Sequence, residues 1–289
     1  MAITQSGLWI LASLTALNGQ SHPDFSGAWS SATTIPLERP AKLKDQAFYT
    51  KEQAAELAKK NAANDDPLSR LETGQSMQPS LRTSIITDPP NGLLPVMTPS
   101  AAAAKKARIE RLHDPTTALD MGTQDRCLLF PTGVPPMIPY RYNSNYQIVQ
   151  TGDALVVEAE MIHDARIISL DGRAHLPSNI RLWKGDSVGH WEGATLVVDT
   201  TNLNDAGGYY GDAGGMYGWD RNMHVVERFS LLNPNTILYR FEVEDSTTYT
   251  RPWKGELIMT RVANPPFEYA CHEGNSDLPN ILKLSSHTK

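Results

Sequence analysis

The chain has 289 residues, of which 40% are hydrophobic, a composition that is ordinary for a globular protein with a buried core. Its 26 Lys and Arg and 32 Asp and Glu give a formal net charge of −6, without long runs of one sign. Nucleic acids and anionic membrane surfaces both attract concentrated positive charge, so this balance argues against either as a partner.

An apolar run of ten residues, Leu8–Leu17, lies near the N-terminus. It is too short to span a bilayer and has the length of a signal-peptide core, although no Lys or Arg precedes it. We therefore expect residues 1–21 to be a signal peptide and the mature chain to be periplasmic or secreted, with no integral membrane segment. The alternative is a buried helix or strand.

The next part of the chain, residues 22–126, is predicted to contain helices. Thr50 and Gln53 have the spacing of a capping box, and good helix formers follow them. Thr98 is suited to cap a second helix, with Pro99 at its first position. The predicted elements are strands at Phe25–Ser30 and Leu81–Thr87 and helices that begin after Thr50 and Thr98.

From Cys127 onward the sequence predicts short strands joined by tight turns. Residues 130–142 hold four prolines and cannot form a central strand. A hairpin turns at Gly193, and Asp171-Gly172 is read as another turn. The predicted strands are Asn145–Gln150, Ala154–Met161, Ala165–Leu170, Ser187–Trp191, Leu196–Thr201, His224–Leu231, Ile237–Val243, Glu256–Arg261 and Phe267–Cys271.

This pattern predicts a mainly β fold. An antiparallel barrel removes the exposed edges of so large a sheet, which favours a barrel over an open sandwich. We expect one β-barrel domain over residues 22–289, calycin-like or lipocalin-like, in which residues 127–289 form the β-meander. The two N-terminal helices are expected to pack outside the barrel.

The segment Ala206–Trp219 combines six glycines with four aromatic residues. One interpretation is a mobile flap over a pocket, in which Tyr209, Tyr210 and Trp219 contact a substrate. The alternative is a surface loop anchored by its aromatic rings. It lacks the features of a phosphate-binding loop.

Alternation along the predicted strands places two ionisable residues in apolar rows. His163 continues the row of Leu155, Val157 and Ala159, and Glu227 lies between apolar neighbours on its own strand. Burial moves the pKa values of an imidazole and a carboxyl group toward neutrality, where acid–base chemistry is efficient. We therefore predict His163 and Glu227 as a catalytic pair. The alternative is a buried polar pair that is only structural.

Other polar residues near these strands are predicted to bind the substrate. For Arg228, an ion pair at the surface or rim is the favoured alternative. The histidines show no spacing that is diagnostic of a metal site, so neither a metal nor another cofactor is predicted. The predicted substrate-binding residues are Arg166, Asp199, Asn204, His224 and Arg228, together with the three aromatic residues named above.

Two cysteines, Cys127 and Cys271, bracket the β-rich half of the chain. In an oxidising compartment, a disulfide between them would close a long loop and stabilise the fold by on the order of 4 kcal/mol. The alternative is a pair of unpaired buried thiols.

Several stretches resemble a family of uncharacterised secreted bacterial proteins that is common among soil acidobacteria. The resemblance covers most of the chain after residue 22, except residues 50–80, and it implies export. It also favours the disulfide and a shared site that includes the polar residues above, but it implies no particular activity. The matching stretches are residues 22–29, 125–128, 146–151, 161–175, 185–205, 224–229, 249–257 and 268–275.

Together these features predict an exported enzyme that acts on a small apolar or aromatic molecule held inside the barrel. Its chemistry would be cofactor-independent acid–base catalysis of the lyase, hydratase or isomerase type. The alternatives are a non-catalytic small-molecule carrier and a structural envelope protein of the same fold.

Overall fold

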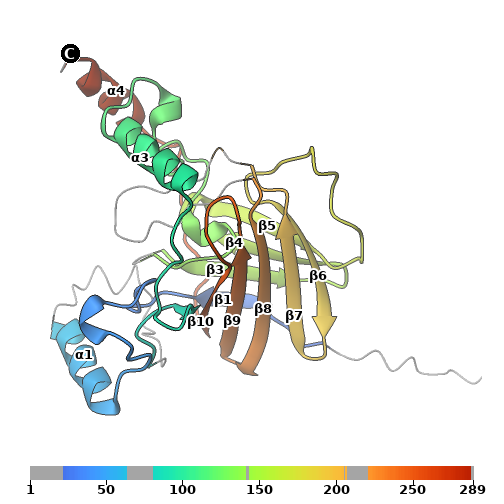
Figure 1. Ribbon diagram of the computed structural model, residues 1–289. Helices are drawn as coiled ribbons and strands as arrows, with labels where there is room; N and C mark the ends of the chain where they lie inside the picture. Colours follow the sequence, from blue (N-terminus) through green and yellow to red (C-terminus); the bar gives the residue numbers. More distant parts are fainter. Residues whose placement is uncertain (1–21, 64–80, 141–142, 205, 207–220, 288–289) are drawn as a thin grey trace, which may run out of the picture.

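A closed barrel of nine strands, β1 and β3 to β10, forms the centre of the molecule (Figure 1). The computed structural model describes residues 22–63, 81–140, 143–204, 206 and 221–287. The strands are β1 (Gly27–Ser30), β2 (Ile86–Asp88), β3 (Asn145–Gln150), β4 (Ala154–Ala159), β5 (Asp164–Ser169), β6 (Asp186–Glu192), β7 (Thr195–Thr201), β8 (His224–Asn233), β9 (Thr236–Glu244) and β10 (Trp253–Arg261).

The strands follow one another around the barrel in the order β1-β3-β4-β5-β6-β7-β8-β9-β10. The barrel closes because β1 pairs with the end of β10, where Trp29 lies opposite Arg261. The short strand β2 pairs with the beginning of β10, at Lys254 and Gly255. The predicted barrel is therefore confirmed, and the meander from β6 to β10 is antiparallel throughout.

One pair of strands departs from the predicted antiparallel order. β5 and β6 run parallel, with Ile168 opposite Ser187. A parallel pair cannot be joined by a tight hairpin, because the chain must first return to the other end of the sheet. The prediction of a simple turn at Asp171-Gly172 was therefore incomplete. Residues 170–185 instead form a long crossover between the two strands, which we call the crossover segment.

The crossover segment is held against the end of β7. Leu182 forms a bridge with Leu203, and the side-chain amide of Asn202 donates to the carbonyl groups of Leu176, Pro177 and Ile180 at 3.0–3.1 Å. These contacts fix a segment that has no regular secondary structure of its own. They determine which of its side chains reach the outer wall of the barrel.

Other predicted elements differ mainly at their ends. The predicted strand Leu81–Thr87 is reduced to Ile86–Asp88, and the predicted strand Phe267–Cys271 is wrong, since those residues form no strand. The helix α4 (Asp277–His287) follows instead, and it was not predicted. Its apolar residues Leu278, Ile281 and Leu282 have helical spacing, a signal that the strand-based prediction for this part of the chain did not use.

Two further helices, α1 (Lys51–Ala63) and α3 (Pro99–His113), are drawn outside the barrel wall in Figure 1. Thr50 and Gln53 exchange the two hydrogen bonds of a capping box at the start of α1. At the start of α3, the Thr98 hydroxyl accepts from the backbone of Ala101 and donates to the carbonyl of Thr247. The latter contact attaches α3 to the connection between β9 and β10.

The barrel interior is occupied by large side chains. Alternate residues along each strand point inward, and the inward rows of β8 and β9 are buried along most of their length. The largest of these interior residues have exposed fractions of 0–2%: Trp29, Tyr146, Phe229, Tyr239, Phe241 and Trp253.

The proline-rich segment before β3 lies against this interior. Its described residues, 130–140, form no strand, as predicted, and among them the short 3-10 helix Pro131–Gly133 is the one regular element. The backbone N–H of Met137 donates to the Tyr239 hydroxyl at 3.0 Å, and the Tyr146 hydroxyl donates to the carbonyl of Thr132 at 3.1 Å. Thr132 and Met137 are fully buried, so this segment contributes to the core.

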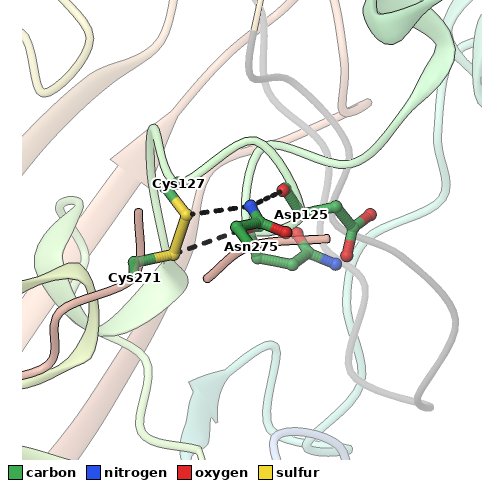
Figure 2. The surroundings of a disulfide bond; sticks show 5 residues. Asp125, Cys127, Cys271 and Asn275 are labelled. Atoms are coloured by element: carbon green, nitrogen blue, oxygen red, sulfur yellow. Dashed lines mark hydrogen bonds between the residues drawn. A yellow bond between two sulfur atoms is a disulfide. The ribbon is translucent and has the colours of Figure 1, made fainter. Parts of the chain in front are cut away.

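Cys127 and Cys271 form a disulfide across 144 residues of sequence, which confirms the predicted pairing. The bond joins the segment before β3 to the segment after β10 (Figure 2). The side-chain amide of Asn275 lies beside it and donates to the carbonyl of Asp125 at 3.0 Å (Figure 2). The loop closed by the disulfide contains β3 to β10.

Some predictions concern residues outside the described ranges. These are the signal peptide at residues 1–21 and the substrate contacts of Tyr209, Tyr210 and Trp219. Within the described ranges, no helix combines the length and the apolarity that crossing a bilayer requires.

Candidate functional site

A buried ion pair lies in the middle of the barrel. Arg166 on β5 and Glu227 on β8 have side-chain exposures of 3% and 0%. The guanidinium group binds the carboxylate with two hydrogen bonds: one joins Nη1 to Oε1 at 2.9 Å, and the other joins Nη2 to Oε2. This bidentate geometry is the strongest arrangement available to an arginine and a carboxylate.

The remaining polar atoms of this interior pair are also bonded. Arg166 donates to the hydroxyls of Ser187 at 3.0 Å and Thr200 at 2.9 Å. The Tyr239 hydroxyl donates to Oε1 of Glu227 at 2.7 Å. Burial alone lowers the pKa of Arg166, but the attraction of Glu227 outweighs it and the pKa is raised. Burial, followed by the charge of Glu227, raises the pKa of Tyr239, which keeps its proton and its role as donor.

The structure does not bring the predicted catalytic pair together. His163 is 36% exposed, and its Nε2 lies 3.2 Å from Oε1 of Glu158, an outward-facing residue of β4. The expected alternation fails after Ala159, because β4 ends there and a tight turn follows. Ile162 and His163 have positive φ values of 67° and 53°, which no continuing strand adopts. Glu227 has Arg166, rather than a histidine, as its charged partner.

A second polar cluster lies on the outer wall of β6, β7 and β8. It begins at Asp186, at the start of β6, whose side chain is 3% exposed beneath the crossover segment. Arg173 donates to both carboxylate oxygens, at 3.1 and 2.5 Å, and the backbone N–H of Leu176 donates at 2.9 Å. His175 places its Nδ1 3.0 Å from Oδ2 of the same carboxylate.

The cluster continues through Asp199, which points outward from β7. Its Oδ1 lies 3.0 Å from Nε2 of His175, and its Oδ2 lies 2.9 Å from Nε2 of His224, at the start of β8. Side-chain exposures are 30% for His175, 39% for Asp199 and 35% for His224. The four side chains therefore form a continuous array, Asp186–His175–Asp199–His224, whose last members reach solvent. We call it the outer array.

The electrostatics of the outer array favour charged groups. The hydrogen bond from His224 lowers the pKa of Asp199, with burial opposing this and His175 adding to it. The same bond raises the pKa of His224 above 6.5 against the opposing effect of burial. Burial alone raises the pKa of Asp186, but the bonds from Arg173, Leu176 and His175 together lower it to about 2. Both aspartates are therefore carboxylates at neutral pH.

Among the predicted substrate-binding residues that the structure describes, Asp199 and His224 lie together, whereas Arg166, Asn204 and Arg228 lie apart from them. Arg166 belongs to the buried interior pair. Asn204 accepts a hydrogen bond from the backbone of Ala206 at 3.1 Å, and Arg228 forms an exposed ion pair with Glu192 at 2.8 Å. Arg228 therefore forms the surface ion pair that was the alternative to substrate binding.

The residues that the prediction missed are Arg173, His175 and Asp186. Arg173 and His175 lie in the crossover segment, and Asp186 is the first residue after it. Strand alternation carries no information at these positions. Arg173 and His175 follow the Asp171-Gly172 turn at alternate positions, and Asp186 opens the next strand. That spacing of polar residues beside a strand start was the signal available in the sequence.

In the described part of the chain, no group of His, Cys, Asp and Glu side chains is arranged to hold a metal ion. Comparisons with protein-family models, curated proteins and solved structures find no match to this chain. The interpretation of the outer array therefore rests on its own geometry.

Proposed function

We propose that the protein is an enzyme that transfers protons at the outer array, with His224 as the general acid–base group. One observation carries the proposal: Nε2 of His224 is bonded to Asp199, while the ring remains 35% exposed. Its Nδ1 has no partner among the described residues, and it can therefore exchange a proton with a small molecule. The reaction would belong to the lyase, hydratase or isomerase type and act on a small molecule.

The pairing of His224 with Asp199 suits this role physically. A carboxylate bonded to one nitrogen fixes the tautomer and orientation of an imidazole and stabilises its charged form. Because the pKa of His224 is raised above 6.5, a larger fraction of this ring carries a proton at neutral pH than in a free imidazole. A group that is partly protonated near the working pH serves both as acid and as base.

The site proposed here differs from the one expected inside the barrel. Arg166 and Glu227 have their bonding groups occupied by one another and by protein hydroxyls, and they are 3% and 0% exposed. A substrate would have to displace those bonds and enter a space filled by aromatic side chains. This weighs against His163 and Glu227 as the catalytic pair.

The second candidate is a protein without catalytic activity. The saturated interior pair favours a structural envelope protein over a carrier, because a carrier needs interior space for its ligand. The likeness to calycins and lipocalins stays a prediction. The antiparallel meander from β6 to β10 favours it, and the parallel pair of β5 and β6 is a departure from it.

Export also belongs to this proposal. Disulfides persist in oxidising compartments, so the bond between Cys127 and Cys271 favours a periplasmic or secreted protein. Fractionation of expressing cells, with mass determination of the recovered chain, tests this. The expected result is an extracytoplasmic chain shortened near residue 21, and recovery of a full-length chain from the cytoplasm would contradict it.

The activity is tested without knowing the substrate by incubating the protein with a bacterial metabolite extract in deuterium oxide. Mass spectrometry should find at least one compound that is consumed or that gains solvent deuterium. His224→Gln should slow that conversion by roughly 10²-fold or more, the usual contribution of a general acid–base group.

His190→Gln is the matched control for this experiment, because His190 also lies on the outer wall but is 61% exposed, and its one polar contact in the described part of the chain is with Glu192 at 3.4 Å. Its conversion rate should equal that of the wild type. If no compound is converted, or if both variants behave alike, the proposed activity is wrong.

A further inference from the structure

His175 occupies an unusual position between two carboxylates. Its Nδ1 lies 3.0 Å from Asp186 and its Nε2 lies 3.0 Å from Asp199. A neutral imidazole carries one N–H, so it can donate to only one of these neighbours and turns a lone pair toward the other. Both contacts are hydrogen bonds only when the ring carries two protons. The geometry therefore matches an imidazolium ion held between two negative charges.

Asp186 is the fixed end of this arrangement. Three donors other than His175 already hold its carboxylate: the two guanidinium nitrogens of Arg173 and the backbone N–H of Leu176. At 3% exposure it can neither turn away nor bind water freely. His175 is thus anchored at Nδ1, and its Nε2 is aimed at Oδ1 of Asp199.

Asp199 is consequently shared by two imidazoles, one on each carboxylate oxygen. We propose that Asp186 and His175 are positioning residues for His224: they hold Asp199 in place, and Asp199 in turn sets the protonation of His224. This inference rests on the proposed function, since it assigns the regulation of the same site. It identifies the pH range of activity as a property of the whole array.

The sign of the dependence follows from the charges around His224. A proton on His175 places a positive charge on the far side of the shared carboxylate and so disfavours a second proton on His224. The other charged groups facing His224 come from β9, where Glu244 lies opposite it in register and Glu242 lies further along. Lys254 on β10 binds Glu242 at 2.8 Å, and Arg173 is engaged by Asp186. Removing the His175 ring should therefore raise the pKa of His224.

Titration of the imidazole signals by NMR tests this directly, with the full chain and no ligand. In the wild type, the signal of His224 gives the reference pKa, which lies above 6.5. His175→Phe should raise that pKa by about 0.5, the shift expected when a nearby charge in partly solvated surroundings is removed. His190→Gln, the control, should leave the titration of His224 unchanged.

Asp186→Asn provides an independent variant. The loss of the Asp186 charge by itself lowers the pKa of His224, but it also weakens the hold on a positive charge at His175, which raises the pKa of His224. We expect the pKa of His224 to rise in Asp186→Asn, and we expect this rise to disappear in the double variant with His175→Phe. A decrease, or the same change in both backgrounds, would overturn the proposal.

The outcomes separate this inference from the proposed function. An unchanged titration of His224 in folded His175→Phe would end the inference. Turnover that depends on His224 would still stand in that case. Conversely, a raised pKa of His224 in that variant, without any turnover in the wild type, would support the array and contradict the enzyme.

Discussion

The two polar clusters of this barrel both contain hydrogen-bonded acidic and basic side chains, but they differ in what surrounds them. The interior pair of Arg166 and Glu227 is at most 3% exposed and binds three hydroxyl groups. The outer array ends in Asp199 and His224, which are 39% and 35% exposed. A charged group that is fully buried and fully hydrogen-bonded has no accessible bonding atom left for a substrate. The comparison teaches that access to solvent, rather than burial alone, distinguishes a candidate site from a structural ion pair.

The largest expected effect comes from breaking the interior pair. Glu227→Gln leaves the guanidinium of Arg166 buried without a charge partner, which should lower the free energy of unfolding by about 3–5 kcal/mol. Urea denaturation measures this loss. The double variant Arg166→Met/Glu227→Leu removes both charges and should recover most of the stability, since an apolar pair of similar volume is often tolerated. Equal loss in the single and double variants would contradict the view that the cost comes from the unpaired guanidinium.

A smaller effect is expected from Asp199→Asn in the outer array. The amide can still bond to one histidine but no longer stabilises a positive charge on His224, so turnover should fall by roughly 10-fold or more at neutral pH. Stability should change by less than in Glu227→Gln, because the group is partly solvated. Parallel rate and denaturation measurements on both variants test the contrast, and a reversed order would contradict it.

The pH dependence of stability should also distinguish the clusters. The raised pKa of His224 contributes stability that is complete below the unfolded value of 6.5 and is lost as the pH rises through the folded value. The lowered pKa of Asp199 contributes stability that is present above 3.8 and is lost as the pH falls through its folded value. The ion pair of His224 and Asp199 should therefore stabilise the fold most between pH 3.8 and pH 6.5.

Solvent screening keeps this contribution to about 1 kcal/mol or less. Denaturation midpoints of the wild type and His224→Gln, measured from pH 4 to pH 9, should converge at the alkaline end. A constant difference between the two proteins over that range would contradict the ion pair.

The smallest effect is expected at His163. Its ring is 36% exposed and contacts Glu158 at 3.2 Å, so His163→Gln should change stability by no more than about 0.5 kcal/mol. Conversion of metabolites should also be unaffected. A large loss of turnover in this variant would restore the interior interpretation that the geometry opposes.

The strands could largely be predicted because period-two alternation and turn residues are local signals. β3 and the hairpin of β6 and β7 occur within one or two residues of their expected bounds. Glu227 was correctly placed in the interior for the same reason. The parallel pairing of β5 with β6 could not be predicted, because a turn such as Asp171-Gly172 can open a hairpin or a crossover.

The candidate site was only half predicted for a related reason. Asp199 and His224 lie on strands, where alternation is informative, whereas His175 is brought to them by the crossover. Its contact with Asp199 spans 24 residues and depends on how that segment returns along the wall. His163 shows the reverse error, since alternation was extended through a turn that ends it.

The most direct test compares two folded variants in the same metabolite assay. One is His224→Gln, and the other is the double variant Arg166→Met/Glu227→Leu, with folding of each checked by circular dichroism. If the chemistry belongs to the outer array, the first variant loses conversion and the second retains it. Retained conversion in His224→Gln together with loss in the double variant would place the reaction inside the barrel and contradict this account.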